Sequence, residues 1–275
     1  YQYNYPQQLY PSFDAIPPVV VNSLLFIENR FLLDPRQPLA NPAVDWPRFG
    51  MAAYTQVAKM LHLPGQSAGG STLATQLEKY RHSPEGLTVS GGEKIRQMIS
   101  ASVRAYQDGP QTLKSRQNVV RDYLNSVPLS AVPGHGEVHG MAEGLRVWYG
   151  TDFVKANEQL NSPQTDPKTM ADKGLALREM LSLMIAQRRP SHYLTRGREE
   201  LANLTDSHLR LLKQSGVIDS ALADAALAST VSYRDWQTQP TIQPIETNKG
   251  ISAARSRLAS MLNRPLYDLD RLDLS

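Results

Sequence analysis

The chain has no cysteine among its 275 residues. Disulfide bonds, thiolate catalysis and zinc–thiolate sites are therefore excluded, and both oxidising and reducing compartments are compatible with the composition. The sequence also has no uninterrupted apolar run of membrane-spanning length. It begins with tyrosine, so a signal or anchor segment of the natural protein would lie outside this sequence.

Several motifs of well-known sites are missing as well. There is no Walker loop and no GxGxxG, and the absence of SxxK and KTG excludes a transpeptidase site within these residues. In HGEVHG, residues 135–140, His135, Glu137 and His139 alternate, which would place them on one side of an extended segment. HExxH spacing is absent, however, so a glycine-rich loop with incidental histidines is favoured over a zinc site, and no metal site is predicted.

The charge is small overall but unevenly distributed. Hydrophobic residues make up 41% and charged residues 20% of the chain, which is ordinary globular composition. The net charge is +3, yet residues 79–121 hold eight Lys or Arg against three acids. A basic middle predicts an anionic partner such as a phosphate or an acidic membrane surface. Aromatic residues are scarce among these basic ones, so nucleic acid is not expected as a partner.

Helical periodicity dominates the sequence, and strand signals such as VSYRDW (231–236) are sparse. Residues 35–47 are rich in proline and predict a loop, whereas Gly216 and Asp219 are typical of a helix stop and a helix cap. The patterns predict a mainly helical domain with a looser tail from about Gln237. We expect helices at 17–33, 46–61, 71–81, 93–107, 117–127, 175–187, 199–214 and 219–228.

Glu28 is the most informative single residue. On a helix that continues to residue 33, apolar side chains at positions 24, 25, 31 and 32 would surround it on one face. Burial of a carboxylate among apolar neighbours raises its pKa toward the range that is useful for proton transfer. A partly exposed glutamate paired with Arg30 or another base is the alternative.

The 93–107 helix carries the second group of candidates. Lys94 and Gln97 lie on a different face from its apolar residues, and a solvated charged surface is the alternative to a ligand site. In the 117–127 helix Asn125 closes the apolar stripe, as a capping residue or a ligand contact. The predicted buried stripe of the 93–107 helix consists of Ile95, Met98, Ile99, Ser102, Val103 and Tyr106.

GGSTLATQLEK, residues 69–79, begins with two glycines before a helical pattern. Ser71 and Thr72 are good helix caps, and the free N–H groups of a first helical turn attract anions. Gln76 and Lys79 lie on the opening turns. The segment is therefore either a helix cap only or a cradle for a negatively charged ligand.

Taken in order, these segments resemble the peptidoglycan glycosyltransferase domain of class A penicillin-binding proteins and monofunctional transglycosylases. IPPVVVNSLLFIENRF resembles the first motif of that family, a helix with Glu-Asp, then Phe and His. GGSTLATQLEK resembles GGSTITQQLAK, EKIRQM takes the place of RKxxE, and SRQNVVRDYLN takes the place of SKxEILExYLN. GEVHGMAEGLRVWYG and LSLMIAQRRPSHY resemble later family segments.

The resemblance implies a mainly α, lysozyme-like glycosyltransferase domain with a smaller jaw-like lobe at residues 15–235. Residues 1–14 would be an irregular lead-in, and residues 236–275 would be a linker toward a possible further C-terminal domain. The implied substrate is lipid II, which the family polymerises into glycan strands. The implied location is the periplasmic face of a bacterial cytoplasmic membrane. No cofactor is certain; some family members need a divalent cation, Mg or Mn.

By the same resemblance Glu28 would be the general base, and Lys94 would stabilise the departing diphosphate. Gln97 takes the position of the second family glutamate, so any function that needs a carboxylate there is lost. Arg116 keeps the charge of a family lysine but changes its shape. The implied substrate-binding residues are Asn29, Arg30, Gly70, Ser71, Thr72, Gln76, Lys79, Arg116 and Asn125.

The sequence thus supports a divergent peptidoglycan glycosyltransferase, with Glu28 and the basic residues as its motivation. Two alternatives stay open. The replacement by Gln97 favours a catalytically impaired module that binds lipid-linked glycan or cell wall. A lysozyme-like cleaving enzyme could use Glu28 as its acid, although cleavage would not need the basic middle of the chain.

Overall fold

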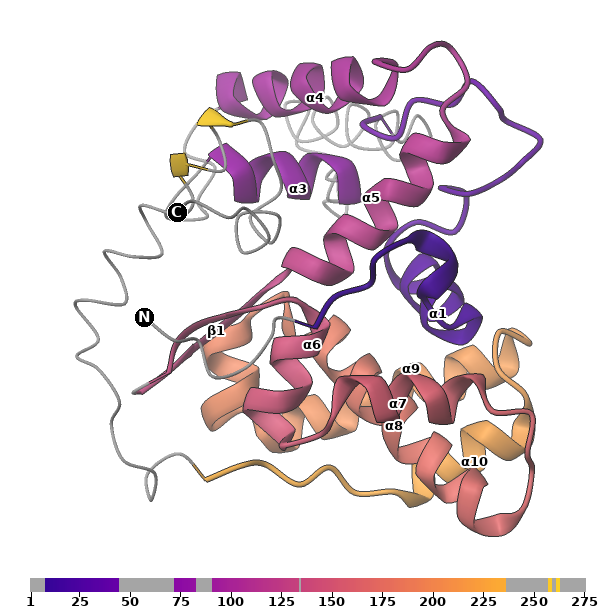
Figure 1. Ribbon diagram of the computed structural model, residues 1–275. Coiled ribbons are helices and arrows are strands. Elements are labelled where there is room, and N and C mark those ends of the chain that lie inside the picture. Colours follow the sequence, from indigo (N-terminus) through magenta and orange to yellow (C-terminus); the bar gives the residue numbers. More distant parts are fainter. Residues whose placement is uncertain are drawn as a thin grey trace, which may run out of the picture. The chain divides into compact units, whose positions relative to one another are not determined.

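The structure of the chain is a computed structural model that describes residues 8–44, 72–82, 91–133, 135–235, 257–258 and 261–262. It forms two compact units (Figure 1). The smaller unit is Glu28–Val120, and the larger unit combines Tyr1–Ile27 with Arg121–Ser275. The predicted helix at 46–61 lies outside the described residues. The predicted domain boundaries after residues 14 and 235 stay predictions.

The larger unit is mostly helical and contains one hairpin of two strands. Helix α1 (Pro18–Glu28) reaches its boundary with the smaller unit, and α5 (Leu113–Ser126) crosses the other boundary. The further elements are η1 (Phe13–Ala15), β1 (Pro128–Val132), β2 (Gly136–His139), α6 (Gly140–Gly144), η2 (Leu145–Tyr149), α7 (Phe153–Asn161), α8 (Pro167–Ala186), η3 (His192–Arg196), α9 (Arg198–Gln214) and α10 (Ser220–Ala228).

Helix α8 forms the core of the larger unit, where α7, α9 and α10 pack against it (Figure 1). Asp166 caps its start by accepting a 3.1 Å hydrogen bond from the Thr169 N–H, and Pro167 occupies the first turn. Every residue from 176 to 186 is buried, as expected for a helix surrounded by other helices. A Cβ on Gly174 would lie 2.5 Å from the Ala225 carbonyl carbon, so glycine permits the close approach of α10.

The hairpin is antiparallel and pairs Pro128 with His139 and Val132 with Gly136. Its register shifts between Pro128 and Ala131, where Ser130 adopts a left-handed φ of 70°. The hairpin was not predicted from the sequence, because the strands are short and β2 falls in the HGEVHG segment that we interpreted as a loop.

The smaller unit contains α3 (Leu73–His82), α4 (Gly91–Ala105), the first part of α5 and the loop after α1. One cluster of its described core is made of short side chains: Ala43, Ala74 and Ala101 are buried, and Val44 and Val119 pack against them. Leu32, Leu73 and Leu77 of this unit are buried as well. Short side chains allow helices to approach closely but bury little apolar area.

The predicted mainly helical fold with a smaller lobe is confirmed. Helix α10 begins after its Asp219 cap, and Gly216 stops α9 with a φ of 70°. Two predictions were wrong: α1 ends at Glu28 and not near residue 33, and the described residues 231–235 form no strand. Among the described residues, no helix has the length and the apolar character needed to cross a membrane.

Candidate functional site

Glu28 is the last residue of α1, and its side chain is half-buried. The expected apolar surround is incomplete, because the helix does not continue through positions 31 and 32. Phe31 is 63% exposed, whereas Leu32 is buried at 4%. The prediction that four apolar side chains enclose Glu28 on one helical face was therefore wrong. Its carboxylate lies where the helix gives way to a turn.

Asn29 and Arg30 form that turn. The side-chain oxygen of Asn29 accepts a 3.2 Å hydrogen bond from the Phe31 N–H, and its carbonyl accepts from the Leu32 N–H at 3.2 Å. Asn29 thus shapes the exit from the helix, as short amide side chains do in turns. Arg30 is exposed. Their predicted contact with substrate stays a prediction.

Helix α3 begins with a reciprocal cap made by two threonines. The Thr72 N–H donates to Thr75 Oγ1 at 2.8 Å, and the Thr75 N–H donates to Thr72 Oγ1 at 3.3 Å. Thr75 thus does here what Glu or Gln does in a capping box. Thr72 is 3% exposed, so its hydroxyl serves the cap. Gln76 and Lys79, further along α3, are half-buried, and Gly70 and Ser71 lie outside the described residues.

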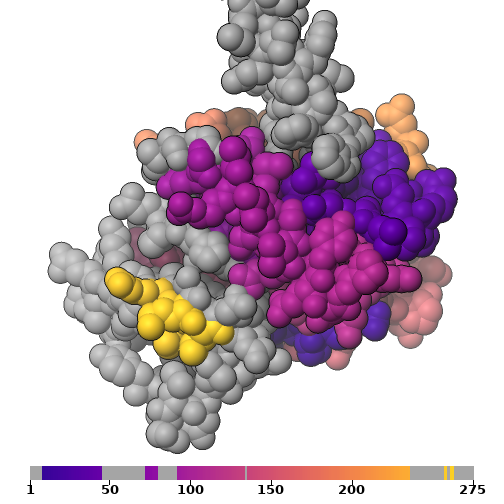
Figure 2. All heavy atoms as spheres, turned by 90° about the horizontal axis from the view of Figure 1, so that it is seen from above, coloured from indigo at the N-terminus to yellow at the C-terminus, as the bar shows by residue number. Residues whose placement is uncertain are grey.

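Helix α4 buries a different face from the one that we predicted. The predicted stripe is largely exposed: 60% at Ile95, 59% at Ile99 and 67% at Val103. Its buried face holds Gln97, with 8% exposure, and Ala101, with 4%. The hydrophobic pattern alone was misleading because the protein buries small and polar residues of this helix and leaves its largest apolar side chains outside. Figure 2 shows the molecule from above, with the atoms of α4 in view in purple and magenta.

A buried ion pair connects α3 to α4. Glu78 is 1% exposed, and Arg104 Nε donates to its Oε1 at 2.8 Å. Ser100 Oγ donates to its other oxygen, Oε2, at 2.6 Å. The sequence analysis did not identify Glu78 or Arg104, because nothing in a helical pattern shows which charged residue faces a neighbouring helix.

Lys94 and Gln97 are on α4 with one turn between them, but their surroundings differ. Lys94 is exposed, so its ammonium group is open to an anionic ligand. Gln97 is buried at 8% exposure on the face that carries Ser100 and Arg104. The interpretation of both residues as solvated surface is therefore wrong for Gln97.

Arg116 is a structural residue in this protein. It is 1% exposed, and its guanidinium donates to the carbonyl oxygens of Leu32, Asp34 and Gln37 at 2.8, 3.3 and 2.8 Å. The planar group thus connects α5 to the loop that follows Glu28. Its prediction as a substrate contact is corrected, because its terminal nitrogens already bind the backbone of that loop.

Arg116→Lys is expected to lower the free energy of unfolding by about 1–3 kcal/mol, because an ammonium group cannot reach three carbonyls that a guanidinium spans. Chemical denaturation of the two proteins measures the change. Lys114→Arg, at an exposed position of the same helix, is the matched control and should leave stability within about 0.5 kcal/mol. An Arg116→Lys variant as stable as the wild type would contradict this assignment.

Asn125 is likewise structural. Its Nδ2 donates to the Tyr10 carbonyl at 3.0 Å, and its Oδ1 accepts from the Tyr10 N–H at 3.0 Å. The side chain is 5% exposed and pairs with the backbone of the N-terminal segment as a strand would. The prediction of a substrate contact is corrected, since both ends of the amide are used within the larger unit.

The histidines of HGEVHG contact Glu143 through one ring nitrogen and one backbone N–H. His135 Nε2 lies 2.9 Å from Glu143 Oε1, and the His139 N–H donates to Glu143 Oε2 at 2.8 Å. Burial alone would raise the pKa of the Glu143 carboxyl, but its contacts with His135 and His139 hold it below its usual value. No group of three His, Asp or Glu in the described part of the chain could hold a metal ion. No reaction step is therefore derived through a divalent cation.

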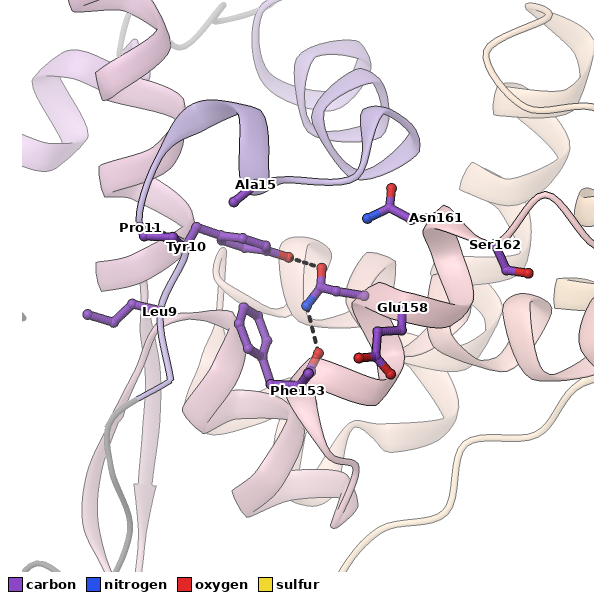
Figure 3. A pocket seen from close by; sticks show the side chains of 10 residues that line it. Leu9, Tyr10, Pro11, Ala15, Phe153, Glu158, Asn161 and Ser162 are labelled. Atoms are coloured by element: carbon purple, nitrogen blue, oxygen red, sulfur yellow. Dashed lines mark hydrogen bonds between the residues drawn. The ribbon is translucent and has the colours of Figure 1, made fainter.

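Figure 3 shows a shallow pocket of about 440 Å³ in the larger unit. The Tyr10 hydroxyl donates to Asn157 Oδ1 at 2.8 Å, and Asn157 Nδ2 donates to the Phe153 carbonyl at 2.7 Å. The Tyr10 and Phe153 rings meet edge to face, with centroids 4.8 Å apart. The polar groups of Tyr10 and Asn157 are thus hydrogen-bonded within the pocket. The pocket contains none of the predicted site residues.

The structure brings Glu28, Gln76, Lys79, Lys94 and Gln97 into the smaller unit. They come from the end of α1, from α3 and from α4. A half-buried carboxylate, an exposed ammonium group and a second lysine in one compact unit could support proton removal and the binding of a diphosphate. The sequence analysis also missed Glu179, a buried carboxylate of α8 in the larger unit, with 3% exposure.

No curated protein matches the chain. The family described as Transglycosylase matches residues 1–215. This match, together with the mainly helical structure, confirms the lysozyme-like fold that the motifs implied. It covers well over half of the sequence and supports a peptidoglycan glycosyltransferase-like function in general, so the chain belongs to the transglycosylase family.

Proposed function

We propose that this protein polymerises lipid II into glycan strands on the outer face of a bacterial cytoplasmic membrane. The observation that carries the proposal is the placement of Glu28, Lys79 and Lys94 in one compact unit of a transglycosylase-family chain. The partners would be lipid II and the nascent strand.

Glu28 would act as the general base. Its carboxylate would take the proton from the 4-hydroxyl of the acceptor sugar while that oxygen attacks the anomeric carbon of the donor. The bond between the anomeric carbon and the diphosphate oxygen breaks in the same reaction, and the lipid diphosphate leaves with the electron pair. A carboxylate at the end of α1 is compatible with this function, because it has access to solvent without being fully hydrated.

Lys79 and Lys94 would stabilise the negative charge that grows on the leaving diphosphate. An ammonium group that is already in place as this charge develops lowers the barrier without reorganisation. Gln76 would help to orient the donor from the first turns of α3. Gln97 would take no part in proton transfer, since a side-chain amide does not take up a proton near neutral pH.

Polymerisation of fluorescent lipid II tests the proposal. Glycan chains made by the full chain, and seen as a ladder after electrophoresis, would support the enzyme. Lipid II binding that depends on Lys79 and Lys94, without any polymer, would refute it and would favour a catalytically impaired binding module. Shortening of preformed glycan strands would favour a cleaving enzyme instead.

The exposed face of α4 would contact the membrane surface. Ile95, Ile99 and Val103 follow one another at helical spacing, each at least 59% exposed. Lys94 and Arg96, both exposed, lie beside them on the same helix. Apolar side chains flanked by basic ones are the combination that binds an interface of anionic lipids.

Ile99→Asp is expected to weaken binding to vesicles that contain phosphatidylglycerol by about tenfold or more, because it removes one apolar side chain from the lipid and adds a charge of the wrong sign. Sedimentation with vesicles measures the change. Val154→Asp, at an exposed apolar position of α7, should bind like the wild type. Equal weakening by both substitutions would contradict the assignment of the membrane contact to α4.

A further inference from the structure

A buried carboxylate, with both oxygens hydrogen-bonded, joins α3 to α4 beside the apolar contact of Ala74 and Ala101. Glu78 accepts from Arg104 Nε at 2.8 Å and from Ser100 Oγ at 2.6 Å, and it is 1% exposed. Hydrogen bonds to an ionised group are short and strong, and their geometry is selective. A shift of α3 along α4 would separate this buried charge from Arg104 and Ser100, so these two bonds favour one seating of the helices.

Gln97 lies on the same face of α4 as Ser100 and Arg104. Residues 97, 100 and 104 are spaced by three and four positions, so they lie on one face of α4. That face carries the two residues that bind Glu78, and Gln97 on it is 8% exposed. A second carboxylate here would be buried on the face that already binds one, and like charges oppose each other's ionisation. A neutral amide at position 97 avoids this repulsion with Glu78.

The two helices also carry the proposed diphosphate-binding groups. Lys79 directly follows Glu78 on α3, and Lys94 lies one turn before Gln97 on α4. The distance between the two ammonium groups therefore depends on how α3 is seated on α4. A diphosphate is a small ligand, so a displacement of one helix by about 1 Å would misplace one of the two cations.

We propose that Glu78 is a positioning residue that holds Lys79 and Lys94 at the separation needed for one diphosphate, and that it replaces a carboxylate at position 97. In the motifs that the chain resembles, alanine stands at the position of Glu78 and glutamate at that of Gln97. This chain thus has a carboxylate at the α3 position and a neutral amide at the α4 position. The catalytic consequence of this inference rests on the proposed lipid II polymerisation; its structural consequence does not.

The structural consequence can be measured directly, because the chain has no cysteine. Spin labels attached to a Lys79→Cys, Lys94→Cys protein report the separation of α3 and α4 by pulsed electron resonance. We expect a narrow distance distribution, which Glu78→Gln broadens or shifts. Exchange of the two side chains, in Glu78→Ala with Gln97→Glu, should restore the narrow distribution. A distribution that Glu78→Gln leaves unchanged would overturn the proposal, whatever the activity.

The catalytic consequence is tested in the protein that retains both lysines. We expect Glu78→Ala and Gln97→Glu each to lower kcat/KM for lipid II by about 100-fold, and the exchange variant to recover to within about tenfold of the wild type. If the losses in kcat/KM of the two single variants add up in the exchange variant, the claim that Glu78 replaces a carboxylate at position 97 is overturned. If the Glu78 variants do not fold, the exchange variant alone decides. An exchange variant that folds and has a narrow distance distribution supports the proposal, and an exchange variant that does not fold overturns it.

The two proposals fail in different ways. A wild type that makes no polymer, but whose label distances respond to Glu78 as expected, refutes the polymerase and retains the positioning role. A wild type that makes polymer, but whose label distances do not change in Glu78→Gln, refutes the positioning role only.

Discussion

Replacing Glu28 with glutamine is expected to lower the rate of lipid II polymerisation by about 10²–10⁴-fold, the range that general base catalysis contributes. Glutamine keeps the size of the side chain and can still accept a hydrogen bond, but it cannot take the proton of the acceptor hydroxyl. The change should not unfold the protein, because Glu28 is only half-buried. A negative charge at a helix C-terminus is also mildly unfavourable. Initial rates of chain growth measure the effect.

The matched control for this substitution is Glu158→Gln, at an exposed carboxylate of α7, which should polymerise at the wild-type rate. Lipid II binding should survive Glu28→Gln, since the two lysines proposed for the diphosphate are untouched. A rate within threefold of the wild type would show that Glu28 is not the base. Loss of binding together with the rate would point to misfolding around the end of α1.

Glu179→Gln is expected to stabilise the protein by about 3 kcal/mol at pH 8 and by almost nothing near pH 4.5. Burial of this carboxyl raises its pKa from 4.5 to about 7, and a hydrogen bond from Thr151 offsets only part of that rise. Its Oε2 has no hydrogen-bond partner among the described residues. Ionisation in this position is therefore costly.

The sign follows from the protons bound by each state. Between pH 4.5 and about 7 the folded protein keeps a proton on Glu179 that the unfolded chain has released. A folded state that binds more protons loses stability as the pH rises, by up to about 1.4 kcal/mol per pH unit for one group. Glutamine never ionises, so the variant lacks this loss. Its advantage over the wild type grows through that window and is constant above it.

Urea unfolding of both proteins at pH 4.5, 6 and 8 tests this expectation. All other titrating groups are common to the two proteins, so the difference between their free energies of unfolding isolates Glu179. A difference for Glu179→Gln that is the same at all three pH values would contradict a raised pKa.

Helices α9 and α10 of the larger unit were predictable from the sequence because their caps and stops are local, whereas α7 (Phe153–Asn161) was not predicted although Asp152 caps it. Asp219 caps α10 and Gly216 ends α9, and both signals lie within a few residues of the element they bound. The start of α8 at Pro167 was missed because apolar periodicity begins only at Leu175. The hairpin was missed because its strands are short. Neither strand has a sequence pattern that by itself predicts the pairing of Pro128 with His139.

The site was predictable in its residue types but not in its orientations. Motif order identified Glu28, Lys79 and Lys94, and all three are in the smaller unit. The direction of α4 could not be read from its pattern, because exposed Ile95 and Val103 look like core residues. Likewise, our reasoning for Glu28, a carboxylate among apolar neighbours, applies better to Glu179, which lies in the run ALREMLSLMIA.

The division of the chain has a consequence for its synthesis. The smaller unit is inserted into the sequence of the larger one, which it splits after Ile27. Tyr10 meets Asn125 across 115 positions, so the N-terminal segment must wait for its partner until the ribosome has made the whole inserted unit. Folding during translation, which usually proceeds from the N-terminus, is thus delayed for the larger unit. During this interval α1 exposes its apolar face, and a chaperone that binds such segments would find it there.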